Sequence, residues 1–126
     1  MRRSLTSLRH ALHGFEHAFR RERNLRLFLG GYGLVLVVGL FVGITLAAWM
    51  MLVLCGGFFV ATELINTALE RLVDAFDAHR HKTDPDAERM HEGLKCTKDI
   101  ASAASLIALV TNALVILTVF LTAIEW

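Results

Sequence analysis

The chain has no charged residue between Leu27 and Thr62, a run of 36 residues. The core of a soluble domain does not need an uncharged run of this length, which is typical of membrane-spanning segments. The apolar share of 55% and the positive mean hydropathy also argue against an ordinary soluble domain of 126 residues. We therefore predict an all-α integral membrane protein.

Other absences exclude further classes. The two cysteines, Cys55 and Cys96, are far apart, which excludes a disulfide framework and a paired-cysteine metal site. The sequence has no GxxxxGK[ST] phosphate loop, no GxGxxG dinucleotide motif and no HExxH motif. The basic start, Met-Arg-Arg, is not followed by an apolar core, so we expect no signal peptide and expect the first hydrophobic segment to be retained. We expect no nucleic-acid partner.

The uncharged run is too long for one membrane crossing. As a single helix it would extend about 54 Å, against a hydrocarbon core of roughly 30 Å. We predict a break between Gly39 and Thr45, although Gly39-xxx-Gly43 could also be a helix-packing motif. The predicted spans are residues 25–41, residues 46–69 with a cytoplasmic continuation to about 78, and residues 100–124. Residues 79–93, which contain the single proline, Pro85, are predicted to form a loop, and the third helix to begin near Leu94.

The basic residues predict the orientation. Every Lys and Arg lies before or at the very start of the first span, as Arg26 does, or between the second and the third span, which places the N-terminus and the long loop in the cytoplasm. Residues 1–23 are predicted to form an amphipathic surface helix, and an unbroken helix would put Glu22 on its apolar stripe. A carboxylate there is unexpected unless it turns inward. The stripe consists of Leu5, Leu8, Leu12, Phe15 and Phe19.

An acidic stripe follows the uncharged run directly. Glu63, Glu70 and Asp74 share one face of the predicted second helix, with Asn66 about 60° away. Ionisable groups near bilayer depth are costly, so such a stripe indicates function. Carboxylate and amide oxygens suit Mg²⁺. With Lys98 and Asp99 at the same membrane face, the residues supply a divalent-cation site and a phosphate-attracting cation, as phosphoryl transfer requires.

Three other interpretations remain open. A solvated helix end explains Asp74 well but Glu63 poorly, because Glu63 directly follows the apolar run. A small cation transporter would use the same stripe but predicts carboxylates near mid-bilayer. Transition-metal binding by histidines is the third interpretation, although histidines on a helix face at an interface are common and the loop set lacks a regular ligand spacing. One set is His10, His13 and His17 on one helical face, and the other is His79, His81 and His91 in the loop with Asp84 and Asp86.

The motif Glu63-x-x-Asn66-x-x-x-Glu70-x-x-x-Asp74, followed by Lys98-Asp99-Ile-Ala-Ser102-Ala-Ala, resembles the signature of the prokaryotic diacylglycerol kinase family. These are small integral-membrane lipid kinases. Gly14, Glu22 and Arg26 also match, so the resemblance covers nearly the whole chain. It implies a homotrimer in the bacterial inner membrane with active sites shared between neighbouring subunits. It also implies an enzyme that uses ATP and Mg²⁺ to phosphorylate a lipid hydroxyl, either diacylglycerol or undecaprenol.

The resemblance also implies residue roles. Glu63 corresponds to the catalytic base, and Glu22 and Glu70 to metal-binding carboxylates that also contact the nucleotide, with Asn66 and Asp74 in support. Lys98 and Asp99 resemble the nucleotide-contacting pair, and Arg3 and His10 occupy positions near the nucleotide. Ser102, Arg26 and Glu63 are expected to contact the lipid substrate. A catalytically inactive scaffold of the same fold would not need Glu22, Glu63, Asn66, Glu70 and Lys98 together.

Two departures from the family pattern bear on substrate and nucleotide. The segment between Asp74 and Lys98 is about ten residues longer than in the shorter family members, so its nucleotide contacts cannot be aligned. The segment Glu22-Arg-Asn-Leu-Arg26-Leu-Phe28 resembles the undecaprenol-phosphorylating members more than the diacylglycerol-specific ones. Phe28 replaces a polar residue found in both. These residues favour a polyprenol substrate or a broad specificity.

Overall fold

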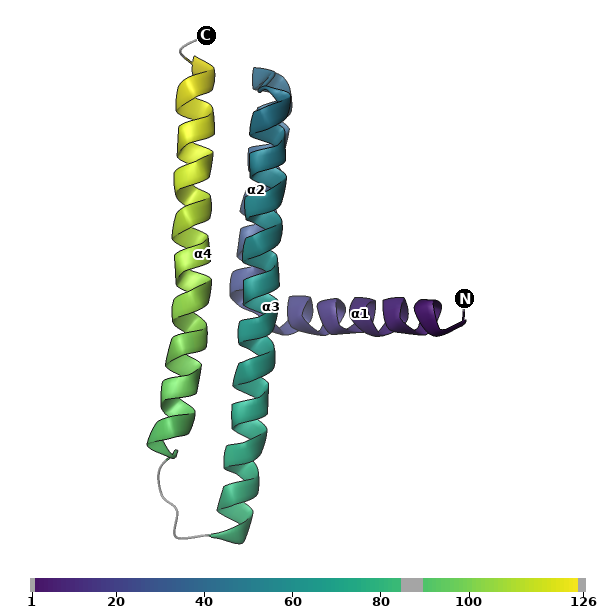
Figure 1. The fold of residues 1–126 in the computed structure, drawn as a ribbon, viewed down its shortest axis with the longest axis vertical. Coiled ribbons are helices and arrows are strands. Elements are labelled where there is room, and N and C mark those ends of the chain that lie inside the picture. The colour runs from purple at the N-terminus through teal and green to yellow at the C-terminus, as the bar shows by residue number, and fades with distance from the viewer. Residues whose placement is uncertain (1, 85–89, 125–126) are drawn as a thin grey trace. The chain divides into compact units, whose positions relative to one another are not determined.

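The computed structural model describes residues 2–84 and 90–124, with no side-chain description for residues 2–4 and 124. The described residues form helices and connections without a strand, which confirms the all-α class. The chain divides into two compact units, residues 1–43 and 44–126. The helices, in chain order, are α1 (Arg2–Arg21), α2 (Arg23–Val42), α3 (Leu46–Thr83) and α4 (Glu92–Ile124) (Figure 1).

The first unit joins the amphipathic helix α1 to the apolar helix α2. The five apolar stripe residues of α1 are all exposed, and the rings of Phe15 and Phe19 stack with centroids 6.3 Å apart. An exposed apolar stripe on a helix with a basic C-terminal turn is the pattern of a helix that lies in a membrane interface.

The helix boundary at Glu22 differs from an unbroken surface helix. Glu22 is the N-cap of α2 and has an extended backbone, with φ −88° and ψ 111°. The chain therefore turns at this residue, and Glu22 does not continue the apolar stripe of α1. The direction of the Glu22 carboxylate is therefore determined by the turn between the two helices and not by the helical periodicity of α1.

The predicted break between the first two spans is confirmed. Helix α2 ends at Val42, and Gly43 adopts a left-handed conformation, with φ 72°, that bonds its N–H to the carbonyl of Gly39. Glycine reaches this region without the steric cost of a Cβ atom. Thr45 then caps α3, because its hydroxyl accepts the N–H of Ala48 at 3.3 Å. The C-cap of α2, Gly43, and the N-cap of α3, Thr45, are thus separated by a single residue.

The second unit is an antiparallel pair of long helices, α3 and α4, packed against each other (Figure 1). Buried residues recur at three- and four-residue intervals on α3, the spacing of one packed helical face. An ion pair between Asp74 and Lys98 marks the register of the two helices. Because both rise about 1.5 Å per residue, Ser105 lies roughly level with Thr67, and Asn112 with Val60.

The helices extend further into the predicted loop than expected. Helix α3 continues to Thr83 rather than about Ala78, and α4 begins at Glu92 rather than near Leu94. The Thr83 hydroxyl donates to the carbonyls of His79 and Arg80, and so provides a hydrogen-bond donor to carbonyl groups in the last turns of α3. Asp84 precedes a proline and has left the helical region, with φ −135° and ψ 88°. Pro85 and Asp86 lie outside the described residues.

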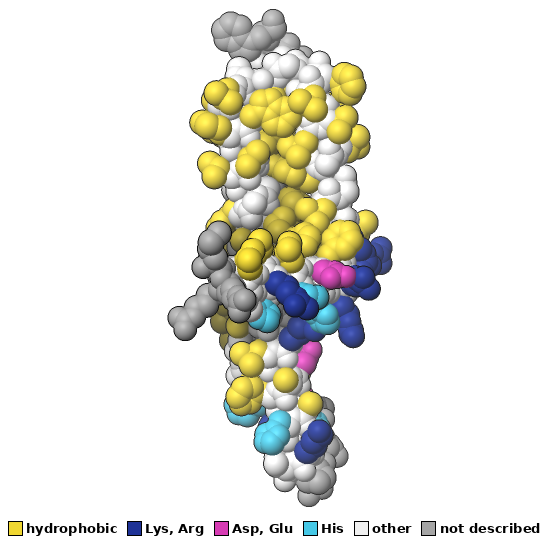
Figure 2. Space-filling view, turned by 90° about the vertical axis from the view of Figure 1, so that its right-hand side faces the viewer, with side chains coloured by type: hydrophobic (Ala, Val, Ile, Leu, Met, Phe, Trp, Pro, Cys, Tyr) yellow, Lys and Arg dark blue, Asp and Glu magenta, His cyan; other side chains and the backbone are white. Residues whose placement is uncertain are grey.

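Three helices are long and apolar enough to cross a membrane, as expected. They are Arg23–Val42, Leu46–Thr83 and Glu92–Ala123, and an 18-residue stretch of each has a mean hydropathy of 2.1, 1.9 and 2.4, respectively. Figure 2 shows that apolar side chains cover much of the upper part of the face that it draws. The protein is therefore a membrane protein.

Candidate functional site

Glu63 is a buried carboxylate at the point where the apolar part of α3 ends. Its side chain is only 5% exposed, and it shares one face of α3 with the buried residues Phe59 and Thr67. Removing a carboxylate from water costs free energy unless a partner compensates. Glu63 directly follows the charge-free run, so this buried carboxylate lies at the border between the apolar and the charged part of α3.

Asn66 and Glu70 form a pair one turn further along α3. The Asn66 amide Nδ2 donates to Glu70 Oε1 at 3.3 Å, and both residues are half-buried. The amide oxygen of Asn66, Oδ1, is buried and has no hydrogen-bond partner among the described residues. A buried acceptor without a donor costs free energy that a cation or a bound donor would recover.

This pair fits part of a magnesium site. Mg²⁺ in phosphoryl-transfer sites is held by one or two carboxylates, substrate phosphates and several waters rather than by a full protein cage. Glu70 and Asn66 Oδ1 are two oxygen donors of the required kind. Within residues 2–84 and 90–124 no group of three or more His, Cys, Asp or Glu gathers as a ready metal cluster. The phosphates and further carboxylates would have to complete the coordination.

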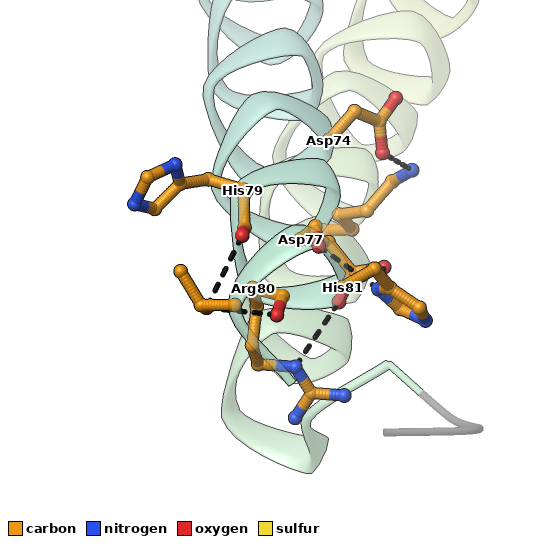
Figure 3. A network of polar contacts seen from close by, with 7 residues as sticks. Asp74, Asp77, His79, Arg80 and His81 are labelled. Carbon is orange, nitrogen blue, oxygen red and sulfur yellow. Dashed lines mark hydrogen bonds and ion pairs between the residues drawn. The ribbon is translucent and has the colours of Figure 1, made fainter. Parts of the chain in front are cut away.

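Asp74 and Lys98 join α3 to α4 at the charged end of the acidic stripe. Lys98 Nζ donates to Asp74 Oδ1 at 2.9 Å, and the Lys98 side chain remains 30% exposed (Figure 3). The ammonium is thus held in place and still reachable. Held lysines of this kind attract and orient phosphate groups.

The sequence interpretation missed a second polar cluster, at the end of α3. Asp77 pairs with Arg80 and with His81, in each case at 3.7 Å, and His81 Nδ1 also lies 2.9 Å from the carbonyl oxygen of Asp77 (Figure 3). His79 and His81 therefore belong to a helix rather than to a loop. The spacing of three and four residues from Asp77 is the signal that could have revealed these pairs.

An apolar groove lies between α3 and α4 beside Asn66. It encloses about 390 Å³, and its walls are almost entirely hydrocarbon. Ser102 and Asp99 are exposed on α4 and do not line it. A groove of this character next to the polar pair Asn66–Glu70 can hold part of a lipid chain. The lining residues are Thr62, Ile65, Asn66 and Leu69 of α3 and Thr97, Ile100, Ala101 and Ala104 of α4.

Helix α4 carries two buried polar side chains that were also missed. Ser105 and Asn112 are 7% and 1% exposed, and neither the serine hydroxyl nor either amide atom of Asn112 has a partner in the described part of the chain. Their separation of seven residues, two helical turns on one face, was the available signal. These side-chain atoms therefore form no hydrogen bond with the residues that the structure describes.

The remaining predicted residues belong to the unit 1–43. Glu22 is half-buried at the start of α2, and no hydrogen bond from its side chain caps that helix. Arg26 is committed to the backbone of α1, because its Nη1 donates to the carbonyls of Phe19 and Arg20. His10 is exposed on α1. Arg3 also lies on α1, but its side chain is outside the described part of the structure.

Comparisons with known proteins agree with the membrane architecture. Residues 9–120 match the family model described as prokaryotic diacylglycerol kinase. The undecaprenol kinase of Bacillus subtilis (strain 168) is 29% identical over 121 residues, which cover 96% of this chain and 90% of that protein. No solved structure matches the chain at a significant level.

Proposed function

Since the chain belongs to the prokaryotic diacylglycerol kinase family, we propose that it transfers the γ-phosphoryl group of ATP, with Mg²⁺, to the hydroxyl of a membrane lipid alcohol. Family membership supports its assignment as a lipid kinase. The phosphoryl donor, the metal ion and the lipid acceptor are part of our proposal. The observation that carries the proposal is the order of groups along α3. A buried carboxylate at Glu63 is followed by the Asn66–Glu70 pair and then by the Lys98–Asp74 pair.

The roles follow from this order. Glu63 lies at the edge of the apolar region, where a lipid hydroxyl is presented, and its carboxylate accepts the hydroxyl proton. Glu70 holds the metal with Glu22, and Asn66 supports it with its unpartnered amide oxygen. Mg²⁺ held by these residues would supply positive charge that neutralises part of the charge of the phosphates.

The nucleotide would be held by basic and acidic groups at the cytoplasmic end. Lys98, kept in place by Asp74, binds phosphate oxygens, and Asp99 contacts the nucleotide beside it. Arg3 and His10 of α1 are further residues that we assign to nucleotide binding. Ser102 binds the lipid headgroup from the exposed face of α4.

We propose a polyprenol as the preferred acceptor. The relative from Bacillus subtilis is named undecaprenol kinase, and the groove beside Asn66 presents a nearly continuous hydrocarbon wall. A groove whose exposed walls are mostly apolar suits the hydrocarbon chain of an isoprenoid alcohol. Diacylglycerol is the alternative acceptor.

We propose a homotrimer in the inner membrane, with the N-terminus and the α3–α4 connection in the cytoplasm. The placement of the basic residues supports this orientation. Among the described residues, no three His, Cys, Asp or Glu side chains gather, an arrangement compatible with sites that a neighbouring subunit completes. The exposed apolar residues along the charge-free part of α3, such as Leu54 and Phe58, would face lipid or another subunit.

The direct experiment is reconstitution of the purified protein in vesicles that contain one lipid alcohol each. Undecaprenol, a shorter polyprenol, diacylglycerol and a saturated long-chain alcohol form the panel, with ATP and Mg²⁺ added outside. We expect phosphorylated undecaprenol as the main product, identified by mass spectrometry. Product from diacylglycerol alone would overturn the polyprenol assignment, and no product from any alcohol would leave the inactive scaffold as the better account.

A further inference from the structure

The corner between α1 and α2 is closed without the residue that usually closes such corners. The last carbonyls of a helix lack intrahelical donors, and a glycine in the left-handed conformation commonly satisfies them. Here α1 ends at Arg21 and α2 begins at Arg23, and no glycine follows before Gly30. The one residue between the two helices, Glu22, has an extended rather than a left-handed backbone.

Arg26 supplies the missing donors. Its Nη1 donates to the carbonyl of Arg20 at 2.7 Å and to that of Phe19 at 3.2 Å. The guanidinium reaches back from the first turn of α2 onto the last turn of α1. A cation at a helix C-terminus also interacts favourably with the helix dipole. The two helices are therefore tied together across Glu22 by one side chain.

The same corner fixes the backbone of Glu22 from both sides. Its N–H donates to the carbonyl of Ala18 at 2.7 Å, and its carbonyl accepts the N–H of Arg26 at 3.3 Å. The Glu22 side chain makes no capping bond of its own. Its carboxylate is thus left available, while its direction depends on a corner that Arg26 holds.

We propose that Arg26 is a positioning residue, which holds the α1–α2 corner so that the Glu22 carboxylate is presented to the metal. The inference rests on the metal-binding role proposed for Glu22. It differs from a role for Arg26 in lipid binding, because it assigns the guanidinium to the two backbone carbonyls that its Nη1 group contacts.

Other arginines of the same region do not share this position. Arg20 pairs with Glu16 on the surface of α1 at 2.7 Å. Arg23 is exposed at the same corner and carries the same charge. Arg23→Gln is therefore a matched control for Arg26→Gln, because both remove one positive charge within one turn of Glu22.

The first test measures the corner itself by hydrogen exchange in lipid nanodiscs. In Arg26→Gln we expect the amide of Glu22 and its neighbours at the end of α1 to exchange at least about tenfold faster. Arg23→Gln should leave them unchanged. Arg26→Lys should be intermediate, since a lysine has the charge but a shorter, single-point donor. Unchanged exchange in Arg26→Gln would overturn the proposal, whatever the activity.

The second test measures the link to Glu22 by kinetics. In Arg26→Gln we expect the Mg²⁺ concentration for half-maximal activity to rise by about fivefold or more, with the KM for the lipid unchanged and partial rescue in Arg26→Lys. A selective rise in the lipid KM would overturn the proposal and assign Arg26 to the substrate. If the wild-type protein phosphorylates no lipid, the proposed function fails, while the exchange comparison still decides whether Arg26 holds the corner.

Discussion

The two parts of α3 treat polar groups in opposite ways. From Leu46 to Thr62 the helix carries no charge, and Asn112 of α4, which lies level with Val60, is buried with no partner in the described structure. From Glu63 to Thr83 charges are frequent and several are paired, as in Asp74–Lys98 and Asp77–Arg80. The residues proposed for catalysis lie at the border, where the buried carboxylate of Glu63 is followed about three turns later by the first of these ion pairs. A lipid hydroxyl and a nucleotide phosphate can meet only where the apolar and charged environments meet.

The largest effect should follow removal of the metal-binding charge at this border. We expect Glu70→Gln to abolish lipid phosphorylation at ordinary Mg²⁺ concentrations, because the carboxylate holds the cation against the phosphates. Membrane insertion and assembly should be retained. Steady-state assays in vesicles, together with size-exclusion chromatography in detergent, measure both. Near wild-type turnover in this variant would contradict the metal assignment.

A smaller effect is expected at the ion pair beyond the border. Asp74→Asn removes the partner that holds Lys98, and activity should fall several-fold with a higher KM for ATP. Stability should change by less than about 1 kcal/mol, since exposed pairs contribute little. Asp77→Asn is the control, because it removes the same charge one turn further from the border. Equal losses of ATP affinity in both variants would indicate a general charge effect instead of a held lysine.

The charge-free part can be tested through Asn112. Burying an amide without partners costs about 1–3 kcal/mol, so Asn112→Leu should raise the thermal unfolding midpoint in detergent. Thr111→Leu, at the exposed neighbouring position, should change it little. A lower midpoint in Asn112→Leu would mean that the amide is satisfied in the assembled protein by water or by a neighbouring subunit. The contrast between the two parts of α3 would then be weaker in the assembled protein than it is within one chain.

The smallest effect should come from the α3–α4 connection. Replacing residues 84–91 with four Gly and Ser residues should leave most of the activity, because loop closure changes by only about 0.6 kcal/mol for each doubling of length. The proposed site residues lie on the flanking helices. Parallel assays of the shortened and full-length proteins at limiting ATP measure the difference. Complete loss in a variant that still inserts and assembles would place a nucleotide contact in this connection.

The sequence predicted the helices better than their ends. Hydropathy and the absence of charge were enough for three spans, and Gly43 marked the break because a left-handed residue was needed there. The continuation of α3 to Thr83 was missed, since the charged composition of residues 79–83 was interpreted as a loop. The pairs of Asp77 with Arg80 and His81 are local contacts that stabilise such a helix, and their spacing was visible in the sequence.

The site was predictable as a set of residues but not as a set of contacts. Helical periodicity placed Glu63, Glu70 and Asp74 on one face, and it could not show that Asp74 bonds to Lys98 across 24 residues of sequence. That pair depends on the register of two long helices. Nor could it show that Arg26 bonds to the carbonyls at the end of α1, because the turn at Glu22 has neither glycine nor proline to mark it.

The most direct test of the border is a single-turnover measurement on Glu63→Gln. The variant and the lipid alcohol, together in nanodiscs, are mixed rapidly with ATP and Mg²⁺, and the phosphorylated lipid is measured after rapid quench. ATP affinity is measured separately by equilibrium binding. We predict a phosphoryl-transfer step slower by about 10² to 10⁴-fold with ATP affinity nearly unchanged, since a general base acts on the chemical step. An unchanged transfer rate with a collapsed ATP affinity would contradict the account and make Glu63 a nucleotide or metal ligand.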